Sequence, residues 1–268
     1  QTFRGGIEWM IVEPSQVVKA KGCTASYIKG LWDEGLDVAK INYDTLVHSH
    51  LMEHQYDLHR FMQLNADCLK PGQRMIFALP DLKTWLKRKY SNALSFEHTY
   101  LISSDYVENI LKAYGFERLE KKSFGNGHSL FYAAERTENP KECRLDGKEL
   151  YQSNKKDFFD AISYFKERAA EYNRRIDESK GPVYLFGAHI FSQMLLNFGL
   201  CRDRIKCVLD NDPLKQGKRL YGTPFLVESP KGLKGKEKPM VILNAGAYTQ
   251  EIKTDILTNV NGNAVIVE

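Results

Sequence analysis

Apolar positions along the chain follow two periods, and the switch between them predicts the order of strands and helices. Short runs rich in β-branched and aromatic residues are typical of buried strands, and apolar residues at every third or fourth position are typical of amphipathic helices. In the first half we expect strands at 7–13, 26–32, 43–50, 73–80, 116–124 and 129–135, and helices at 56–69 and 105–115. The last two strands are joined by residues 125–128 alone, so they must pair antiparallel, because a parallel crossover needs far more chain.

A second alternating series begins after Gly181 and Pro182. The expected strands lie at 183–189, 205–212, 239–248 and 263–268, and the expected helices at 190–199 and 249–258. Regular alternation of strands and helices indicates a mostly parallel sheet with right-handed crossovers. The fold class is therefore α/β in both halves, with a second, smaller α/β domain after the first.

The stretch between the two series loses hydrophobic periodicity at 137–152 and is interpreted as a linker. One long amphipathic helix is expected after it, because apolar residues then recur at spacings of three and four. They are Phe158, Ile162, Phe165, Ala169, Tyr172 and Ile176. The predicted division is a first domain at 1–137, a linker with the long helix at 138–180, and a C-terminal domain at 181–268.

Composition narrows the class of protein without assigning a function. The chain is 43% hydrophobic and 27% charged, which is typical of a globular protein, and it holds no apolar run long enough to span a bilayer. A formal charge of +4 is too small to indicate a nucleic-acid partner. Five widely spaced cysteines without a C-x-x-C motif favour a reducing compartment, and hence a cytoplasmic location.

The first strand, IEWMIVE, ends on Glu13, just before Pro14 and Ser15. An acid at the end of a strand holds the ribose in many nucleotide-binding α/β sheets, about 20 residues after a glycine-rich turn. Here only twelve residues precede Glu13, and Gly5-Gly6 come before the acid's own strand. Glu13 is therefore a ribose ligand without the usual turn, or an ordinary strand end.

Histidines cluster in HSHLMEH, at the carboxyl end of the third strand. His48 and His50 share a strand face by the two-residue period, and His54 follows one helical turn later. Three interpretations stay open: a metal site, histidines hydrogen-bonded in a core, and the lining of a cofactor or substrate pocket. The metal interpretation is not favoured, because no carboxylate or cysteine is obviously placed to complete it.

Glu97 and His98 lie side by side in SFEHTYLISS, before an expected helix. Histidine suits proton transfer near neutral pH, and a neighbouring carboxylate can fix its tautomer. The pair is a candidate for general-base catalysis.

The C-terminal domain carries polar residues at the ends of three expected strands, where open α/β sheets bind ligands. Gly187 stands at a strand-to-helix turn suited to phosphate, but the segment lacks a full G-x-G-x-x-G. The segment LDNDPLKQGKRLYGTP follows the next strand and suits a phosphate-bearing ligand or a surface loop equally. The substrate-binding candidates here are Gly187, Ala188, His189, Asp210, Lys215 and Asn244.

Taken in order, these segments resemble a known family. IVEPS, YDTLVHSHLMEH, LKPGQRMIFALPD, EHTYLIS and LKAYGFE are similar to the later motifs of class I S-adenosylmethionine-dependent methyltransferases. LFGAHIFSQMLLNFGL, VLDNDPLKQGKRLYGTPF and NAGAYTQEI resemble the C-terminal domain of sugar C-methyltransferases, which methylate nucleotide-linked deoxysugars. The resemblance covers nearly the whole chain. It implies two Rossmann-like domains and S-adenosylmethionine as cofactor.

The resemblance also implies roles for individual residues. Glu13 would bind the ribose of S-adenosylmethionine, Trp32 would lie near the adenine, and the segment from His48 to His54 would line the methionine and acceptor side. Glu97 and His98 match the family's glutamate–histidine pair, in which histidine is the base. The acceptor would be a nucleotide-linked sugar or similar phosphorylated metabolite, used in surface polysaccharide biosynthesis, with a homodimer as one assembly.

This sequence differs from the family pattern in three places. The glycine-rich first motif with its strand is missing, as is the N-terminal zinc module, so we expect weak or no S-adenosylmethionine binding by this chain alone. The family's Tyr-x-Glu-His begins with Ser95 here, and its His-Gly-Gly-Ser turn reads GNGHS, with His128 as a further substrate-binding candidate. Two alternative functions stay open. One is a non-catalytic nucleotide-binding module. The other is a nicotinamide-dependent nucleotide-sugar enzyme, although this sequence shows neither the glycine motif nor the Tyr-x-x-x-Lys of that class.

Overall fold

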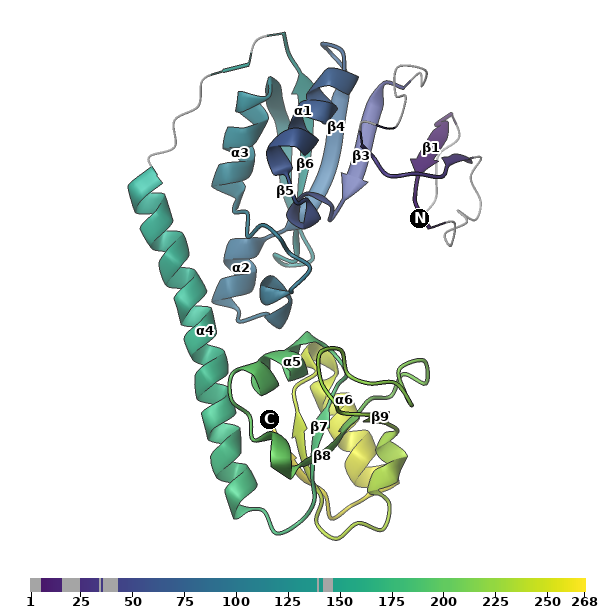
Figure 1. Ribbon diagram of the computed structural model, residues 1–268, viewed down its shortest axis with the longest axis vertical. Coiled ribbons are helices and arrows are strands. Elements are labelled where there is room, and N and C mark those ends of the chain that lie inside the picture. Colours follow the sequence, from purple (N-terminus) through teal and green to yellow (C-terminus); the bar gives the residue numbers. More distant parts are fainter. Residues whose placement is uncertain (1–5, 16–24, 34, 36–42, 139, 142–146) are drawn as a thin grey trace. The chain divides into compact units, whose positions relative to one another are not determined.

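A computed structural model describes residues 6–15, 25–33, 35, 43–138, 140–141 and 147–268 (Figure 1). The chain divides into two compact units. Unit 1 comprises residues 1–81 and 99–145, and unit 2 comprises residues 82–98 and 146–268. Both are α/β, as the alternating pattern predicts. No helix within the described ranges is long and apolar enough to cross a membrane.

Unit 1 is built on a four-stranded sheet with the order β3-β4-β6-β5. Its strands are β3 (Thr45–Ser49), β4 (Arg74–Pro80), β5 (Phe116–Phe124) and β6 (Ser129–Arg136). β3 and β4 are parallel, whereas β6 runs antiparallel to β4 and β5. The predicted antiparallel pairing of the last two strands is confirmed.

One face of this sheet is covered by α1 (Leu58–Cys68) and α3 (Ser104–Ala113), which share a hydrophobic core with it. Alternation along β4 explains the arrangement: Met75 and Phe77 point into this core and are buried, whereas Ile76 is on the other face and is exposed. α1 begins at Asp57, whose side chain accepts a hydrogen bond from the Arg60 N–H at 2.9 Å.

A separate pair of parallel strands precedes this sheet, β1 (Trp9–Val12) and β2 (Ala25–Ile28). The pairing continues past the strand, because the Glu13 N–H donates to the Ile28 carbonyl at 3.1 Å. β2 ends sooner than the expected strand at 26–32.

Unit 2 contains a five-stranded, fully parallel sheet with the order β11-β10-β7-β8-β9. Its strands are β7 (Val183–Phe186), β8 (Ile205–Leu209), β9 (Val227–Glu228), β10 (Met240–Leu243) and β11 (Val265–Val267). The chain moves outward from β7 through β8 to β9 and then returns to the other side of β7 with β10. This is the order of doubly wound nucleotide-binding sheets, with the direction reversing between β7 and β10.

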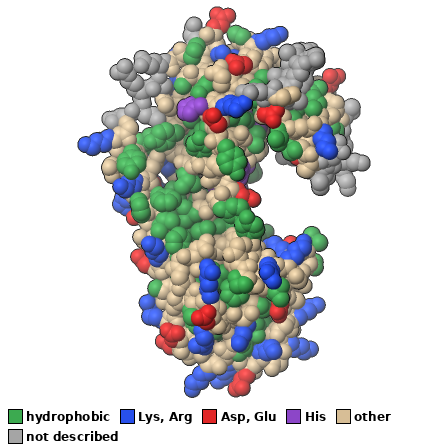
Figure 2. Space-filling view, in the orientation of Figure 1, with side chains coloured by type: hydrophobic (Ala, Val, Ile, Leu, Met, Phe, Trp, Pro, Cys, Tyr) green, Lys and Arg blue, Asp and Glu red, His purple; other side chains and the backbone are tan. Residues whose placement is uncertain are grey.

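Helices α5 (Ile190–Asn197), α6 (Thr249–Asp255) and α4 (Gly147–Glu178) complete unit 2, with α6 continuing as a π-helical turn, η7 (Ile256–Val260). The linker expected at 137–152 is wrong in its second part, because α4 already begins at Gly147. The hydrophobic period of α4 starts only at Phe158, and the described side chains before it include no buried one, so no such period marks residues 147–157 as helical. Figure 2 shows Lys and Arg side chains dispersed among acidic ones on the face drawn, in keeping with the small net charge.

The short helix α2 (Leu82–Lys87) and the two-residue strand β9 are absent from the sequence-based expectation. α2 packs through Trp85 against Ala161 of α4, within a small cluster of its own. Six residues are less than two helical turns, too few for a helical period to be recognised.

The core of unit 2 generates a stability prediction. Leu185 in β7 is fully buried, so Leu185→Ala should lower the free energy of unfolding by about 2–5 kcal/mol, measured by urea denaturation. Leu214→Ala is the matched control, since Leu214 is 75% exposed and should change stability little. Equal effects of the two substitutions would contradict the assignment of β7 to the core.

Candidate functional site

The carboxyl edge of the unit 2 sheet brings together five of the six candidates predicted for the C-terminal domain. Gly187 follows β7 with a φ of 101°, and the Ala188 N–H donates to the Asp210 carboxylate at 2.8 Å. Lys215 Nζ lies 3.1 Å from the same carboxylate oxygen. His189 begins α5 and accepts a hydrogen bond from the Phe191 N–H at Nδ1.

Asn244, the sixth candidate, follows β10 on the other side of the reversal point. Leu243 is in register with Phe186, so Asn244 and Gly187 directly follow paired residues of the two central strands. This is where doubly wound sheets open a crevice for ligands.

The turn after β7 is already filled by the chain's own groups. A Cβ on Gly187 would lie 2.2 Å from His189 Nε2, so the imidazole occupies the space above the glycine. The Asp210 carboxylate takes the Ala188 N–H that a bound phosphate would use. An anionic ligand at this turn must therefore displace Asp210.

Electrostatics at this edge follow from the same contacts. Burial opposes ionisation of Asp210, yet hydrogen bonds from the Asp212 and Ala188 N–H groups and from Lys215 hold its pKa below the ordinary value. Burial lowers the pKa of His189, and nearby Lys215 lowers it further. His189 is thus a neutral hydrogen-bonding group near pH 7.

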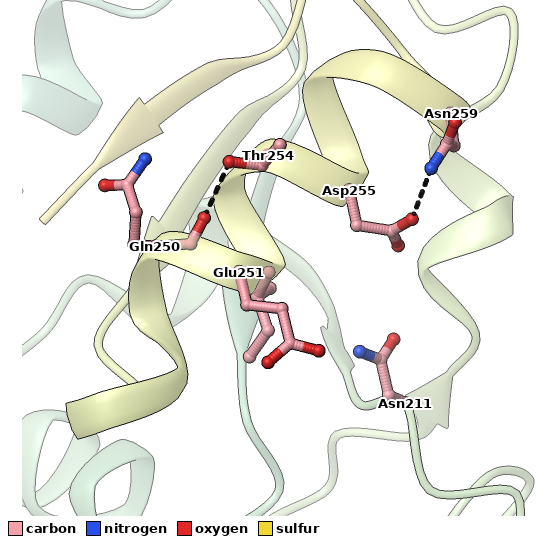
Figure 3. A pocket seen from close by; sticks show the side chains of 7 residues that line it. Asn211, Gln250, Glu251, Thr254, Asp255 and Asn259 are labelled. Atoms are coloured by element: carbon pink, nitrogen blue, oxygen red, sulfur yellow. Dashed lines mark hydrogen bonds between the residues drawn. The ribbon is translucent and has the colours of Figure 1, made fainter.

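Beside this edge lies a polar pocket of about 450 Å³ (Figure 3). Its lining residues are Asn211, Gln250, Glu251, Ile252, Thr254, Asp255 and Asn259. Asn259 donates to the Asp255 carboxylate at 2.8 Å. With carboxylates from Glu251 and Asp255 and no cationic side chain in its lining, the pocket does not favour a phosphate.

The carboxyl edge of the unit 1 sheet holds a second group of polar residues. His50 follows β3 with a φ of 50°, a conformation that costs energy for a residue other than glycine, and its N–H donates to the Ala78 carbonyl at 2.8 Å. Because β6 is antiparallel to β4, its first residue, Ser129, pairs with Pro80 at the same edge. Residues nearly 80 positions apart thus meet here.

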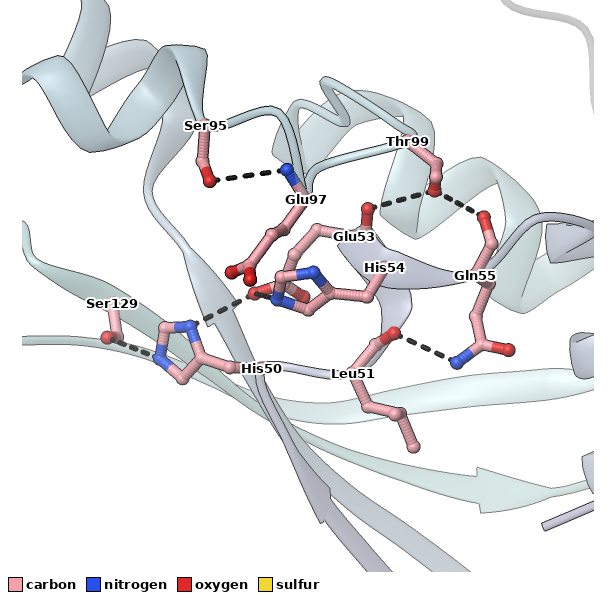
Figure 4. A network of polar contacts seen from close by, with 9 residues as sticks. All are labelled: His50, Leu51, Glu53, His54, Gln55, Ser95, Glu97, Thr99 and Ser129. Atoms are coloured by element: carbon pink, nitrogen blue, oxygen red, sulfur yellow. Dashed lines mark hydrogen bonds and ion pairs between the residues drawn. The ribbon is translucent and has the colours of Figure 1, made fainter. Parts of the chain in front are cut away.

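Four side chains at this edge form one hydrogen-bonded series (Figure 4). His50 Nδ1 lies 3.0 Å from Glu53 Oε1, and His50 Nε2 lies 3.1 Å from Ser129 Oγ. Ser129 Oγ is also 2.8 Å from Nδ1 of His128, whose side chain Figure 4 does not draw. His54 Nε2 is 4.0 Å from Glu53 Oε1.

Glu53 is buried, with 2% of its side chain exposed. Within the described part of the chain, its second oxygen, Oε2, has no hydrogen-bond partner. Its backbone carbonyl accepts hydrogen bonds from the Tyr100 N–H and the Thr99 hydroxyl, both at 3.2 Å, and these fix the short 3-10 helix η2 (Met52–His54). A buried carboxylate oxygen without a partner is costly and indicates a place for a donor.

The structure separates His48 from the other predicted cofactor residues. Its ring stacks on Phe77 at 5.2 Å and meets the edge of Phe61 at 5.4 Å. Both ring nitrogens are buried without a hydrogen-bond partner among the described residues, and burial lowers the pKa of His48 to about 4. His48 therefore packs as a neutral side chain against Phe61 and Phe77.

Glu13 and Trp32 follow β1 and β2. Glu13 is partly exposed, and hydrogen bonds from the Ser15 N–H (3.0 Å) and hydroxyl (2.9 Å) lower the pKa of its carboxylate. Trp32 is partly buried against the unit 1 core and donates through Nε1 to Asn65 Oδ1 at 2.8 Å.

Glu97 and His98 belong to unit 2 and lie in a turn after the 3-10 helix η3 (Ser91–Leu94). The turn is held by Ser95, whose hydroxyl accepts from the Glu97 N–H at 3.3 Å and whose carbonyl accepts from the His98 N–H at 3.1 Å. The His98 ring lies 6.4 Å from that of Trp85.

Comparison with protein-family models identifies both parts of the chain. A methyltransferase domain model matches residues 10–121, and the C-methyltransferase C-terminal domain model matches residues 132–266, half of the chain's 268 residues. The chain belongs to the C-methyltransferase family. A search of curated proteins gave no significant match.

Solved structures with similar folds are methyltransferases of low identity. A methyltransferase bound to the Trm112 activator from Haloferax volcanii is 13% identical, with a TM-score of 0.39 over 48% of this chain and 71% of that one. An S-adenosylmethionine-dependent methyltransferase from Mesorhizobium loti is 12% identical, with a TM-score of 0.37 over 47% of this chain and 79% of that one. Magnesium protoporphyrin IX methyltransferase from Synechocystis, with bound S-adenosylhomocysteine, is 18% identical, with a TM-score of 0.31 over 44% of this chain and 54% of that one.

This C-methyltransferase takes its methyl group from S-adenosylmethionine, as its methyltransferase domain implies. Glu13 fits the ribose end of that cofactor, because its carboxylate is partly exposed, has a lowered pKa and directly follows a parallel strand. Trp32 lies four residues beyond the end of the neighbouring strand β2.

Sequence reasoning missed Glu53 and Ser129. Glu53 lies within HSHLMEH itself, so the statement that no carboxylate accompanies these histidines is wrong. The signal was available in the spacing, since Glu53 follows His50 by three residues, one turn of 3-10 helix. Ser129 carried no local signal, because only the antiparallel placement of β6 brings it to His50.

The core position of His48 generates a prediction on pH. The unfolded chain binds a proton at His48 near its ordinary pKa of 6.5, whereas the folded protein does so only at about 4, so stability should fall as pH drops through this window, by about 3 kcal/mol. His48→Leu should remove this component, so it should raise the free energy of unfolding more at pH 4.5 than at pH 7, measured by urea denaturation. Exposed His59, changed to Leu, is the control. An unaltered pH dependence in His48→Leu would refute the assignment.

Proposed function

We propose that this C-methyltransferase transfers a methyl group to a carbon atom of a nucleotide-linked sugar or similar phosphorylated metabolite. The observation that carries the proposal is the joining, in one chain, of a methyltransferase domain with a C-methyltransferase C-terminal domain whose sheet has the nucleotide-binding strand order. The biological setting proposed with it is surface polysaccharide biosynthesis in the cytoplasm, by a protein that can form a homodimer.

The candidates of unit 2 support recognition of the acceptor's polar part. Asp210 ends the second strand outward from the reversal point, where an acid commonly binds sugar hydroxyls. Lys215 is 42% exposed beside it and supplies a positive charge for a phosphate once Asp210 exchanges partners. Asn244 and His189 add neutral hydrogen-bonding groups at the same edge.

The chemistry requires little covalent participation by the protein. S-adenosylmethionine supplies the methyl group when it is bound. A carbon next to a carbonyl becomes a nucleophile when a base removes its proton, and His98 is the proposed base, with Glu97 orienting it. Alignment of the reactants supplies roughly 7–11 kcal/mol of the barrier, and a positioned base a further 10²–10⁴-fold in rate, on the order expected for such groups.

The base role of His98 predicts a specific kinetic defect. In the whole protein, His98→Ala should lower kcat by about 10²–10⁴-fold with a nucleotide-linked keto-deoxysugar as acceptor, because proton removal loses its base. Affinity for S-adenosylhomocysteine, measured by calorimetry, should not change. His59→Ala is the control on an exposed histidine of unit 1. Undiminished turnover in His98→Ala would exclude the role, and no turnover of any keto-sugar by the native protein would contradict the acceptor class.

The ribose role of Glu13 predicts a binding defect. Glu13→Ala in the whole protein should weaken S-adenosylhomocysteine binding by about 10–100-fold, because charged hydrogen bonds to hydroxyls contribute about 1.5–3 kcal/mol. Glu8→Ala is a matched control, since Glu8 is an exposed acid just before the same strand. Isothermal titration calorimetry measures both. Equal affinities in the two variants would remove Glu13 from the cofactor site.

A further inference from the structure

With Glu53 ionised and His50 neutral, the hydrogen-bonded series in unit 1 has a single direction. The Glu53 carboxylate only accepts, so His50 must donate from Nδ1. A neutral imidazole carries one N–H, so Nε2 of His50 then accepts from the Ser129 hydroxyl. The Ser129 oxygen, having given its proton to that bond, accepts from Nδ1–H of His128. Every proton points toward Glu53.

We propose that Glu53, His50 and Ser129 form a proton relay that holds His128 in the Nδ1–H tautomer and makes its Nε2 a proton acceptor for the methyl acceptor. The relay lies entirely within unit 1 and is built independently of Glu97 and His98. It deepens the proposed function and rests on it, because only an acceptor that also gives up an O–H proton requires a second base beside His98.

Two members of the relay are buried, whereas the side chain of His50 between them is 34% exposed. Glu53 and Ser129 are 2% and 3% exposed, so water does not compete for their bonds. His50 is held in a left-handed backbone conformation, a strain that proteins tend to retain at functional sites. The unpartnered Oε2 of Glu53 is the second, independent observation, since it leaves room for an additional donor at the relay's end.

His128 is the most exposed of the four side chains in the series, which suits contact with a ligand. His128 is exposed, whereas Ser129 behind it is buried. Its N–H donates to the Phe124 carbonyl at 3.0 Å, and its carbonyl accepts from the Asp81 N–H at 3.3 Å. The backbone is thus fixed on both sides, so His128 is presented from a rigid hairpin turn.

Proton transfer through this series balances. His128 Nε2 takes a proton from an O–H group of the acceptor, while the C–H proton goes to the proposed base His98, and the electron pair of the broken O–H bond stays on that oxygen. The Nδ1 proton of His128 passes to Ser129 Oγ, the hydroxyl proton of Ser129 to His50 Nε2, and the Nδ1 proton of His50 to Glu53 Oε1. Both imidazoles end neutral, and the proton resides on Glu53.

Histidine tautomers, read by ¹⁵N–¹H correlation NMR of ¹⁵N-histidine-labelled whole protein, test the relay without any acceptor. His50 and His128 should both be Nδ1–H tautomers, the less common form of a free imidazole. A series running the other way would make His50 a doubly protonated imidazolium and His128 an Nε2–H tautomer, and that result would overturn the proposal. Because no substrate enters, failure here is distinct from failure of the proposed acceptor.

Two substitutions separate the relay from a merely structural contact. Ser129→Ala should convert His128 to the Nε2–H tautomer and leave His59 unchanged. Ser123→Ala, at an exposed serine of the same hairpin, should leave His128 as it is in the native protein. If Ser129→Ala fails to fold, His50→Asn gives the same readout, since asparagine tolerates the left-handed conformation but is shorter. A His128 tautomer that survives whichever substitution folds would refute the relay.

Discussion

The antiparallel insertion of β6 beside β4 is the constraint on which unit 1 depends. It completes the hydrophobic core through Leu130, Tyr132 and Ala134, and it reverses the chain so that Ser129 begins at the carboxyl edge of the parallel pair. A parallel β6 would have placed Ser129 at the opposite edge, far from His50. Packing and chemistry in this unit therefore have a common origin, because the pairing that buries the core also assembles the polar series.

In unit 2, polar groups at the carboxyl edge of the sheet are bonded to one another. The turn after β7 offers an N–H that phosphate-binding proteins give to an anion, and here the Asp210 carboxylate takes it. Lys215 then neutralises that carboxylate, and His189 fills the space above Gly187. Asp210, Ala188 and Lys215 are already bonded to one another, so a ligand that binds them exchanges hydrogen bonds and gains less free energy than it would from unbonded donors.

Sequence patterns predicted most strands and the alternation of both sheets because burial leaves a period in the sequence. They failed where burial leaves none. The first eleven residues of α4 include no buried side chain and α2 is too short for a period, so neither was recognised. Residues of the candidate site were predicted where function depends on position after a strand, as for Glu13, His50 and Asp210. Ser129 was beyond reach, because its role depends on strand order, and His48 was assigned to a pocket because a strand pattern alone does not tell which face is core.

The two edges differ in how their polar groups are satisfied, and this difference assigns them different tasks. In unit 2, the Asp210 carboxylate is saturated by the Asp212 and Ala188 N–H groups and Lys215. In the described part of unit 1, Glu53 keeps a buried oxygen without a partner, at a cost of about 1–3 kcal/mol for such a group. A proton or a ligand donor that bonds to Glu53 Oε2 would remove this cost. The Asp210 carboxylate offers no comparable gain, because its hydrogen bonds are already made.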